Sequence, residues 1–217
     1  MRKMPGEEFD KLVDFFDAMA QTKWLSAIHK ELIHRTGSWS GLNVLDVGCG
    51  TGRLLLKGGK NAEKLTGIDL SSRMIDRCRE IAEEADYQHC EFLVGDAYDL
   101  PFSAESFDLA LSTCVMFLLP EPERGISEIA RVIKRGGKAA MLNPSVYLTE
   151  HAVDDYCSKH QIKDFEKTTM KQWSKVAAKR HSYDEAALNA LLNDYGFQEA
   201  EHCPVLDGLA YITIAKK

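Results

Sequence analysis

The stretch "VLDVGCGTGRLL", Val44 to Leu55, joins a short apolar run to three glycines at alternate positions. A continuous apolar run of this length is typical of a parallel strand that is buried on both faces. Glycine loses more backbone freedom on folding than any other residue, so Gly48, Gly50 and Gly52 within five positions require a reason. Glycines allow a sharp turn and let a ligand press against the peptide groups. The stretch therefore predicts a strand, a tight bend at a ligand site, and a helix.

Length and composition limit the classes of protein to which this chain can belong. The 217 residues are 45% hydrophobic and 28% charged, which favours one globular domain. The net charge of −6 disfavours a nucleic acid partner. No signal peptide or bilayer-length apolar stretch is visible, so we expect a cytoplasmic protein without a membrane partner. The six cysteines lack metal-finger spacing, which predicts free thiols and no metal site. The oligomeric state is not indicated.

Strand and helix patterns alternate around the glycine bend. Such alternation predicts a doubly wound, mostly parallel α/β sheet with helices on both faces. The helix expected at 122–137 would present Ile126, Ile129 and Ile133 on one side and close at Gly136 and Gly137. The expected strands are 42–48, 64–70, 90–97, 106–118 and 138–143, with helices at 51–59, 71–85 and 122–137.

We expect one domain of 217 residues with four parts. These are an N-terminal helical cap (1–40), a cofactor-binding core (41–143), a helical insert (144–181) and a C-terminal helix and strand pair (182–217). The last helix would begin with a capping box at Ser182 and Glu185 and end at Gly196.

The insert carries a lysine at every fourth position. We favour a solvated helix face as its meaning. The alternative is a cationic rim beside the active site, which would select an anionic acceptor. The lysines concerned are Lys159, Lys163, Lys167, Lys171, Lys175 and Lys179.

The position of the bend limits the class of ligand. In an open parallel sheet, ligands bind beyond the carboxyl ends of the strands. Dinucleotide enzymes place GxGxxG at this point, but here the third glycine comes one position early. Asp46 stands two residues before the bend, and its carboxylate would repel a pyrophosphate and attract an ammonium or sulfonium group. The local chemistry favours a positively charged ligand.

At this point the sequence resembles a known family. "VLDVGCGTGRLL" is similar to motif I of the class I S-adenosylmethionine-dependent methyltransferases, and "GIDLS", "GDAYDLPF" and "ISEIARVIKRGG" resemble its later motifs in order. The likeness covers roughly residues 43–143 and continues through "LLNDYGF". It implies a Rossmann-like sheet of seven strands with an antiparallel C-terminal strand. It also implies S-adenosylmethionine as cofactor, S-adenosylhomocysteine as product and a small-molecule acceptor.

The resemblance also implies roles for single residues. Gly48, Gly50 and Gly52 would let the backbone contact the methionine part of the cofactor. Asp46 would orient the loop and face the ammonium group, and Asp69 would accept both ribose hydroxyls. The remaining expected contacts are Leu70 and Met74 on the adenine ring, Asp96 and Ala97 on its polar edge, and Cys49, Thr113 and Cys114 in the same pocket.

No catalytic residue is assigned from the sequence. In-line displacement at a sulfonium depends on alignment and water exclusion, so a general base is optional. A cytosine-C5-type nucleophile at Cys114 is rejected because Thr113, not proline, precedes it. We expect the acceptor between the N-terminal helix and the 144–181 insert. Candidates to contact it are Trp24, Thr113, Cys114, Met116, Phe117, Asn143, Tyr147 and His151.

Two other functions stay open. A non-catalytic regulatory protein that binds S-adenosylmethionine would carry the same motifs. A nicotinamide-dependent oxidoreductase would share the sheet and an acid at Asp69, but the early third glycine disfavours it.

Overall fold

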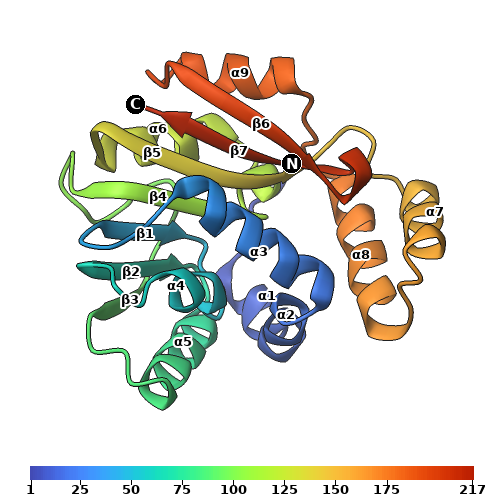
Figure 1. Ribbon diagram of the computed structural model, residues 1–217, viewed down its shortest axis with the longest axis horizontal. Helices are drawn as coiled ribbons and strands as arrows, with labels where there is room; N and C mark the ends of the chain where they lie inside the picture. Colours follow the sequence, from blue (N-terminus) through green and yellow to red (C-terminus); the bar gives the residue numbers. More distant parts are fainter.

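A seven-stranded sheet forms the centre of the computed structural model, which describes all 217 residues (Figure 1). The strand order is β3-β2-β1-β4-β5-β7-β6. Strands β1 to β5 pair in parallel, and β7 is antiparallel to both β5 and β6. The predicted fold class is confirmed. The strands are β1 (Asn43–Val47), β2 (Lys64–Asp69), β3 (Cys90–Val94), β4 (Phe107–Thr113), β5 (Ile133–Pro144), β6 (Glu199–Val205) and β7 (Ala210–Lys216).

Helices cover both faces of the sheet and enclose two separate apolar cores. Successive strand residues point to opposite faces, so Val44 belongs to one core and Leu45 to the other. This burial on both sides explains the continuous apolar runs of the strands. No helix is both long and apolar enough to cross a lipid bilayer. One core is covered by α3 (Lys23–Thr36), α4 (Arg53–Gly58) and α5 (Ser72–Glu84), and the other by α6 (Pro122–Val132). Helix α9 (Glu185–Asn193) contributes Leu188 to the first core and Leu192 to the second.

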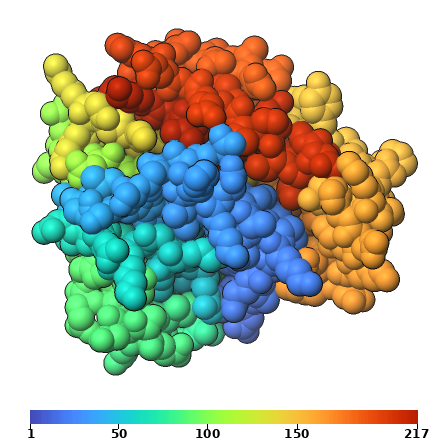
Figure 2. All heavy atoms as spheres, in the orientation of Figure 1, coloured from blue at the N-terminus to red at the C-terminus, as the bar shows by residue number.

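The N-terminal cap contains three helices. Helices α1 (Gly6–Asp10) and α2 (Val13–Ala20) precede α3 and lie beside α5 (Figure 1). In the space-filling view the N-terminal segment lies between the cofactor core and the insert (Figure 2). The cap therefore touches both parts of the molecule.

The insert is a pair of helices, α7 (Glu150–Lys159) and α8 (Asp164–Ala177), that is joined to α3 by two tryptophans. Trp24 of α3 stacks on Trp173 of α8 with ring centroids 5.5 Å apart and an interplanar angle of 14°. The indole Nε1 of Trp24 also donates a hydrogen bond to Thr169 Oγ1 at 3.0 Å. Both indoles are almost fully buried, so the contact fills the space between α3 and the insert.

The predicted end of α6 is wrong. The helix stops at Val132, and Ile133 opens β5 opposite Phe107 of β4. Ile133 is buried, as the helical pattern required, but as a strand residue. Gly136 and Gly137 consequently lie within β5 and do not close a helix. An apolar period that continues from a helix into a strand hides the boundary between them.

The capping box predicted for α9 is also wrong. The N-cap is Asp184, whose carboxylate accepts a hydrogen bond from the backbone N–H of Ala187 at 2.8 Å. Ser182 lies two residues earlier and does not cap the helix. For α5, in contrast, Ser71 is the cap that the sequence allowed, and its hydroxyl accepts from Met74 N at 3.1 Å.

The lysine stripe of the insert is divided between the two helices and is largely paired with acids. Lys167 and Lys171 lie 2.7 and 3.0 Å from carboxylate oxygens of Asp154, and Lys175 lies 3.7 Å from Glu150. None of these lysines lines the central cavity. The structure thus supports a solvated face and gives no support to a cationic rim.

Candidate functional site

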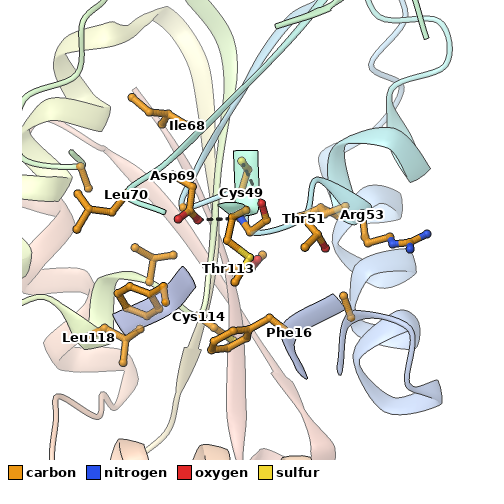
Figure 3. A pocket seen from close by; sticks show the side chains of 18 of the residues that line it. Phe16, Cys49, Thr51, Arg53, Ile68, Asp69, Leu70, Thr113, Cys114 and Leu118 are labelled. Atoms are coloured by element: carbon orange, nitrogen blue, oxygen red, sulfur yellow. Dashed lines mark hydrogen bonds between the residues drawn. The ribbon is translucent and has the colours of Figure 1, made fainter. Parts of the chain in front are cut away.

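A cavity of about 180 Å³ opens at the carboxyl ends of β1, β2, β3 and β4, beside the point where the strand order reverses (Figure 3). Its lining is mainly apolar, with a few polar groups that come from the strand ends. Among the twelve residues predicted to bind the cofactor, all but Asp46 and Gly52 line it. Those that do are Gly48, Cys49, Gly50, Asp69, Leu70, Met74, Asp96, Ala97, Thr113 and Cys114.

The glycine bend is fixed by its backbone. The N–H groups of Gly48 and Cys49 both donate to Ile68 O, at 2.7 and 3.0 Å, which fastens the bend to β2. Gly48 has a φ of +74°, and a Cβ atom there would lie 2.3 Å from Val115 Cγ2. Gly52 begins α4 and packs toward Cys78 of α5, so it shapes the turn and does not face the cavity.

Asp69 projects from the end of β2 toward the bend. Its Oδ2 accepts from Gly50 N and its Oδ1 from Ser71 N, both at 2.9 Å (Figure 3). Burial raises the pKa of Asp69, although these backbone N–H groups act in the opposite direction. Each carboxylate oxygen has a further lone pair, so the group could still accept two neighbouring hydroxyls.

Asp46 lies on β1 behind the bend and is 1% exposed. Its Oδ1 is fully buried and has no hydrogen-bond partner. Burial, together with repulsion from Asp69, raises the pKa of Asp46 to about 7. A cation bound next to the bend would favour the ionised form of this carboxyl.

The end of the cavity near β2 and β3 is narrowed by the first residues of the chain. Asp96 Oδ1 accepts from Tyr98 N at 2.9 Å, and its Oδ2 forms an ion pair with Lys3. Lys3 thus occupies one oxygen of the carboxylate that was predicted to contact the polar edge of adenine. The apolar lining of this end is formed by Leu70, Met74 and Ala97.

Helix α1 is held against the loop that follows β2. Asp10 Oδ1 accepts from Ser71 Oγ at 2.6 Å. Gly6 approaches this loop so closely that a Cβ atom there would lie 2.2 Å from Leu70 O. Any side chain at position 6 would therefore displace α1 from the cavity.

Helix α2 forms a further wall that the sequence did not reveal. Phe16 lines the cavity, and Asp17 ties the helix to α4 by accepting from Arg53 Nε and Nη2 at 2.8 Å each. Asp17 also accepts from Thr51 Oγ1 at 2.9 Å. Burial alone would raise the pKa of Asp17, but the bonds from Arg53 and Thr51 lower it overall. The only signal of this wall in the sequence is the helical spacing of its apolar residues.

The opposite end of the cavity is formed by the end of β4 and by α3. Thr113 and Cys114 come from β4, and Leu25 and His29 come from successive turns of α3. Burial raises the pKa of Cys114 to about 12, so its thiol stays protonated and is a poor nucleophile at neutral pH. His29, which is 4% exposed, was not among the predicted candidates because nothing marks a single histidine on an apolar helix.

Six of the residues expected to contact the acceptor do not line the cavity. Trp24 stacks on Trp173, and this contact fills the space where the acceptor was expected. Met116 and Phe117 belong to the apolar cores. The other three are Asn143, which is buried within β5, and Tyr147 and His151, which are exposed on the surface.

Comparison with known proteins gives a consistent result. Residues 38–194, well over half of the chain, match the family model of a methyltransferase domain. A demethylmenaquinone methyltransferase of Symbiobacterium thermophilum is 34% identical over 150 residues, which cover 64% of this chain and 58% of the relative. A phosphatidylethanolamine N-methyltransferase of Cereibacter sphaeroides is 40% identical over 104 residues, 48% of this chain and 51% of the relative. The chain thus matches little more than half the length of either relative.

Solved structures share the architecture. Magnesium protoporphyrin IX methyltransferase from Synechocystis, solved with bound S-adenosylhomocysteine, has a TM-score of 0.71 to this chain. The match covers 98% of this chain and 97% of that one at 16% sequence identity. At this identity the likeness concerns the fold alone.

Proposed function

The chain belongs to the class I S-adenosylmethionine-dependent methyltransferases, and on that premise we propose that it transfers the methyl group to a small, largely apolar acceptor. The observation that carries the proposal is the continuous cavity between two kinds of wall. One wall is the glycine bend with Asp69, and the other is the apolar end formed by β4, α2 and α3. A cofactor held by the first would present its sulfonium toward the second.

The cofactor contacts follow from the groups at the strand ends. Asp69 would accept the ribose hydroxyls, since each of its oxygens keeps a free lone pair. Asp46, behind the bend, would supply the negative charge that balances the cationic methionine part. Asp96 would take the adenine amino group once Lys3 moves aside. These roles support binding, and the reaction then depends on in-line alignment in a site that excludes water.

The chemistry of the second wall supports an apolar acceptor. Its lining is apolar apart from His29, Thr113 and Cys114, and no acidic side chain reaches it. The similarity to a demethylmenaquinone methyltransferase agrees with an aromatic quinol-type acceptor. An anionic acceptor is not favoured because the insert lysines lie elsewhere.

The test is calorimetric titration of S-adenosylhomocysteine into the wild-type protein and the Asp69→Asn variant. A hydrogen bond to a charged acceptor contributes about 1.5–3 kcal/mol, so we expect the dissociation constant to rise at least about tenfold in the variant. Asp86→Asn, at an exposed turn, is the matched control and should bind as tightly as wild type.

NAD serves as the control ligand in the same experiment. Heat from NAD with none from S-adenosylhomocysteine would replace the proposal with an oxidoreductase. Binding of S-adenosylhomocysteine without methyl transfer to any quinol would favour the non-catalytic binding protein.

A further inference from the structure

His29 is a buried imidazole that the fold leaves without a partner. The side chain is 4% exposed, and its Nδ1 is fully buried without a hydrogen-bond partner. Leaving a buried polar atom unpaired costs about 1–3 kcal/mol. The ring also lines the cavity, beside Leu25 of the same helix. A group that enters the cavity would therefore meet the imidazole ring.

His29 reaches the cavity from the acceptor side. Helix α3 packs against β5 and β7, whereas Leu70 and Asp96 follow β2 and β3, which lie toward the opposite edge of the sheet. Thr113 and Cys114, at the end of β4, lie between these two sides. The imidazole thus faces the part of the cavity that lies beyond the expected position of the sulfonium.

The other titratable groups that line the cavity are paired, protonated or assigned to the cofactor. The titratable groups around the cavity, besides His29, are Lys3, Cys49, Arg53, Asp69, Asp96 and Cys114. Arg53 is paired with Asp17, Lys3 with Asp96, and Asp69 with two backbone N–H groups. The contact with Cys78, together with burial, raises the pKa of the Cys49 thiol, and burial raises that of Cys114, so both thiols stay protonated.

The protonation state of His29 fits a base. Burial, with a smaller contribution from the positive charge of Lys57, lowers the pKa of His29 to about 4. The ring is therefore neutral at pH 7, with one nitrogen lone pair available. An imidazole that is buried and neutral in the free protein can accept a proton as negative charge develops on a bound acceptor.

We infer that His29 is the general base of the methyl transfer, and that the acceptor presents a phenolic or quinol hydroxyl to it. The inference rests on the proposed function. An aliphatic hydroxyl is too weak an acid for an imidazole, and a neutral amine needs no base before it attacks. A phenolic hydroxyl, with a pKa near 10, is far more acidic than an aliphatic one, and its proton can pass to the imidazole as the bond to the methyl carbon forms. The apolar wall around His29 suits the aromatic ring that carries it.

In the proposed step, the hydroxyl proton passes to a ring nitrogen of His29. The oxygen, or the ring carbon that it activates, forms a bond to the methyl carbon, and the electron pair of the broken C–S bond stays on sulfur. Where the ring carbon takes the methyl group, its own proton then leaves to water and aromaticity returns. The products are the methylated acceptor and S-adenosylhomocysteine.

The experiment compares wild type with His29→Gln on a series of naphthols of increasing acidity. General-base catalysis contributes typically 10²–10⁴-fold, so we expect His29→Gln to slow transfer to 1-naphthol about 100-fold. With a nitro-naphthol that is already ionised at about pH 8, the variant should approach the wild-type rate, because no proton remains to be removed. His34→Gln, an exposed position on the same helix, is the matched control.

Titration with S-adenosylhomocysteine distinguishes a failure of this inference from a failure of the proposed function. Both variants should bind S-adenosylhomocysteine as wild type does, and failure of wild type to bind it would overturn the proposed function itself. An equal loss of rate with every naphthol, or no loss, overturns the role of His29. No transfer by wild type to any naphthol overturns the phenolic class.

A measurement on the wild-type protein guards against a variant that does not fold. In protein labelled with ¹³C-histidine, 1-naphthol added to the S-adenosylhomocysteine complex should shift the Cε1 resonance of His29 and leave that of His34 unchanged. An unmoved His29 resonance would overturn the contact.

Discussion

The two ends of the cavity are built by different means. At the cofactor end, the bend is held by backbone hydrogen bonds to Ile68 and by carboxylates at the ends of neighbouring strands. At the acceptor end, the walls are side chains of α2 and α3, and α3 is in turn held by Trp173 of the insert. The first end is therefore specified by backbone geometry, which few sequences satisfy, whereas the second is specified by packing, which many sequences satisfy.

The variant with the greatest expected loss of stability tests whether the acceptor end can be disrupted without a change at the cofactor end. Trp24→Ala removes the stacked indole and its bond to Thr169. Replacing a buried tryptophan by alanine costs about 3–5 kcal/mol, so we expect the free energy of unfolding in urea to fall by that amount. The affinity of the folded protein for S-adenosylhomocysteine should change less than about threefold, since the two sites share no partners.

Trp173→Phe is the control for that variant. The indole Nε1 of Trp173 has no hydrogen-bond partner, so phenylalanine keeps an aromatic face against Trp24 and sacrifices no bond. We expect a smaller loss of stability than in Trp24→Ala. If Trp24→Ala lost affinity for the cofactor in proportion to its loss of stability, the two ends of the cavity would form one cooperative unit. The contrast between the two ends would then be wrong.

An intermediate effect is expected at the bend. Gly48→Ala combines a φ of +74° with a Cβ atom 2.3 Å from Val115 Cγ2. Gly41→Ala has a similar φ of +72° but no atom within 4 Å of the new Cβ, so it isolates the backbone strain. Both variants should lose about 1–2 kcal/mol of stability from that strain. Only Gly48→Ala should weaken S-adenosylhomocysteine binding, by about tenfold or more, because it also shifts the cavity wall.

Calorimetric titration of S-adenosylhomocysteine into the Gly48→Ala and Gly41→Ala variants tests this prediction. Equal affinities in the two alanine variants would show that the bend tolerates displacement, and that the cofactor end is no more demanding than the acceptor end.

The smallest effect that we expect is on the pH dependence of stability, through the proton that Asp46 binds in the folded protein. Its folded pKa of about 7 lies above the ordinary value of a carboxyl, so the folded protein holds this proton more tightly than the unfolded chain. The contribution of this proton to the free energy of unfolding is greatest at low pH. It is lost as the pH rises toward and through 7. Asp46→Asn should remove that part of the dependence of the unfolding free energy on pH.

Cofactor binding should act on the same proton. S-adenosylmethionine favours the ionised carboxylate, so binding at pH 7 should release about half a proton. Titrations in two buffers of different ionisation enthalpy measure this release, and Asp46→Asn should show none. Release that persisted in the variant would assign the proton to another group.

The sequence could mark the glycine bend and the strand-end acids that line the cavity, because their demands are local. A left-handed backbone requires glycine, and a carboxylate directly after a buried strand stands out, as at Asp69. His29 and Phe16 carry no such mark, because their meaning depends on which surface α2 and α3 are folded against. Ile133 shows the same limit within the core: its burial was predicted, but not the element that buries it.

The contact between Trp24 and Thr169 has a consequence for how the chain folds. It joins positions 145 residues apart, and a second bond, from Lys23 N to Glu166, spans 143. Such contacts form only after a long loop has closed, which slows folding. During synthesis α3 leaves the ribosome long before α8 exists, so the side of α3 that carries Trp24 stays uncovered until the insert has been made. The wall that α3 gives the cavity therefore gains this support only after β1 to β5 have been made, and a nascent chain that stops before residue 164 has no partner for Trp24.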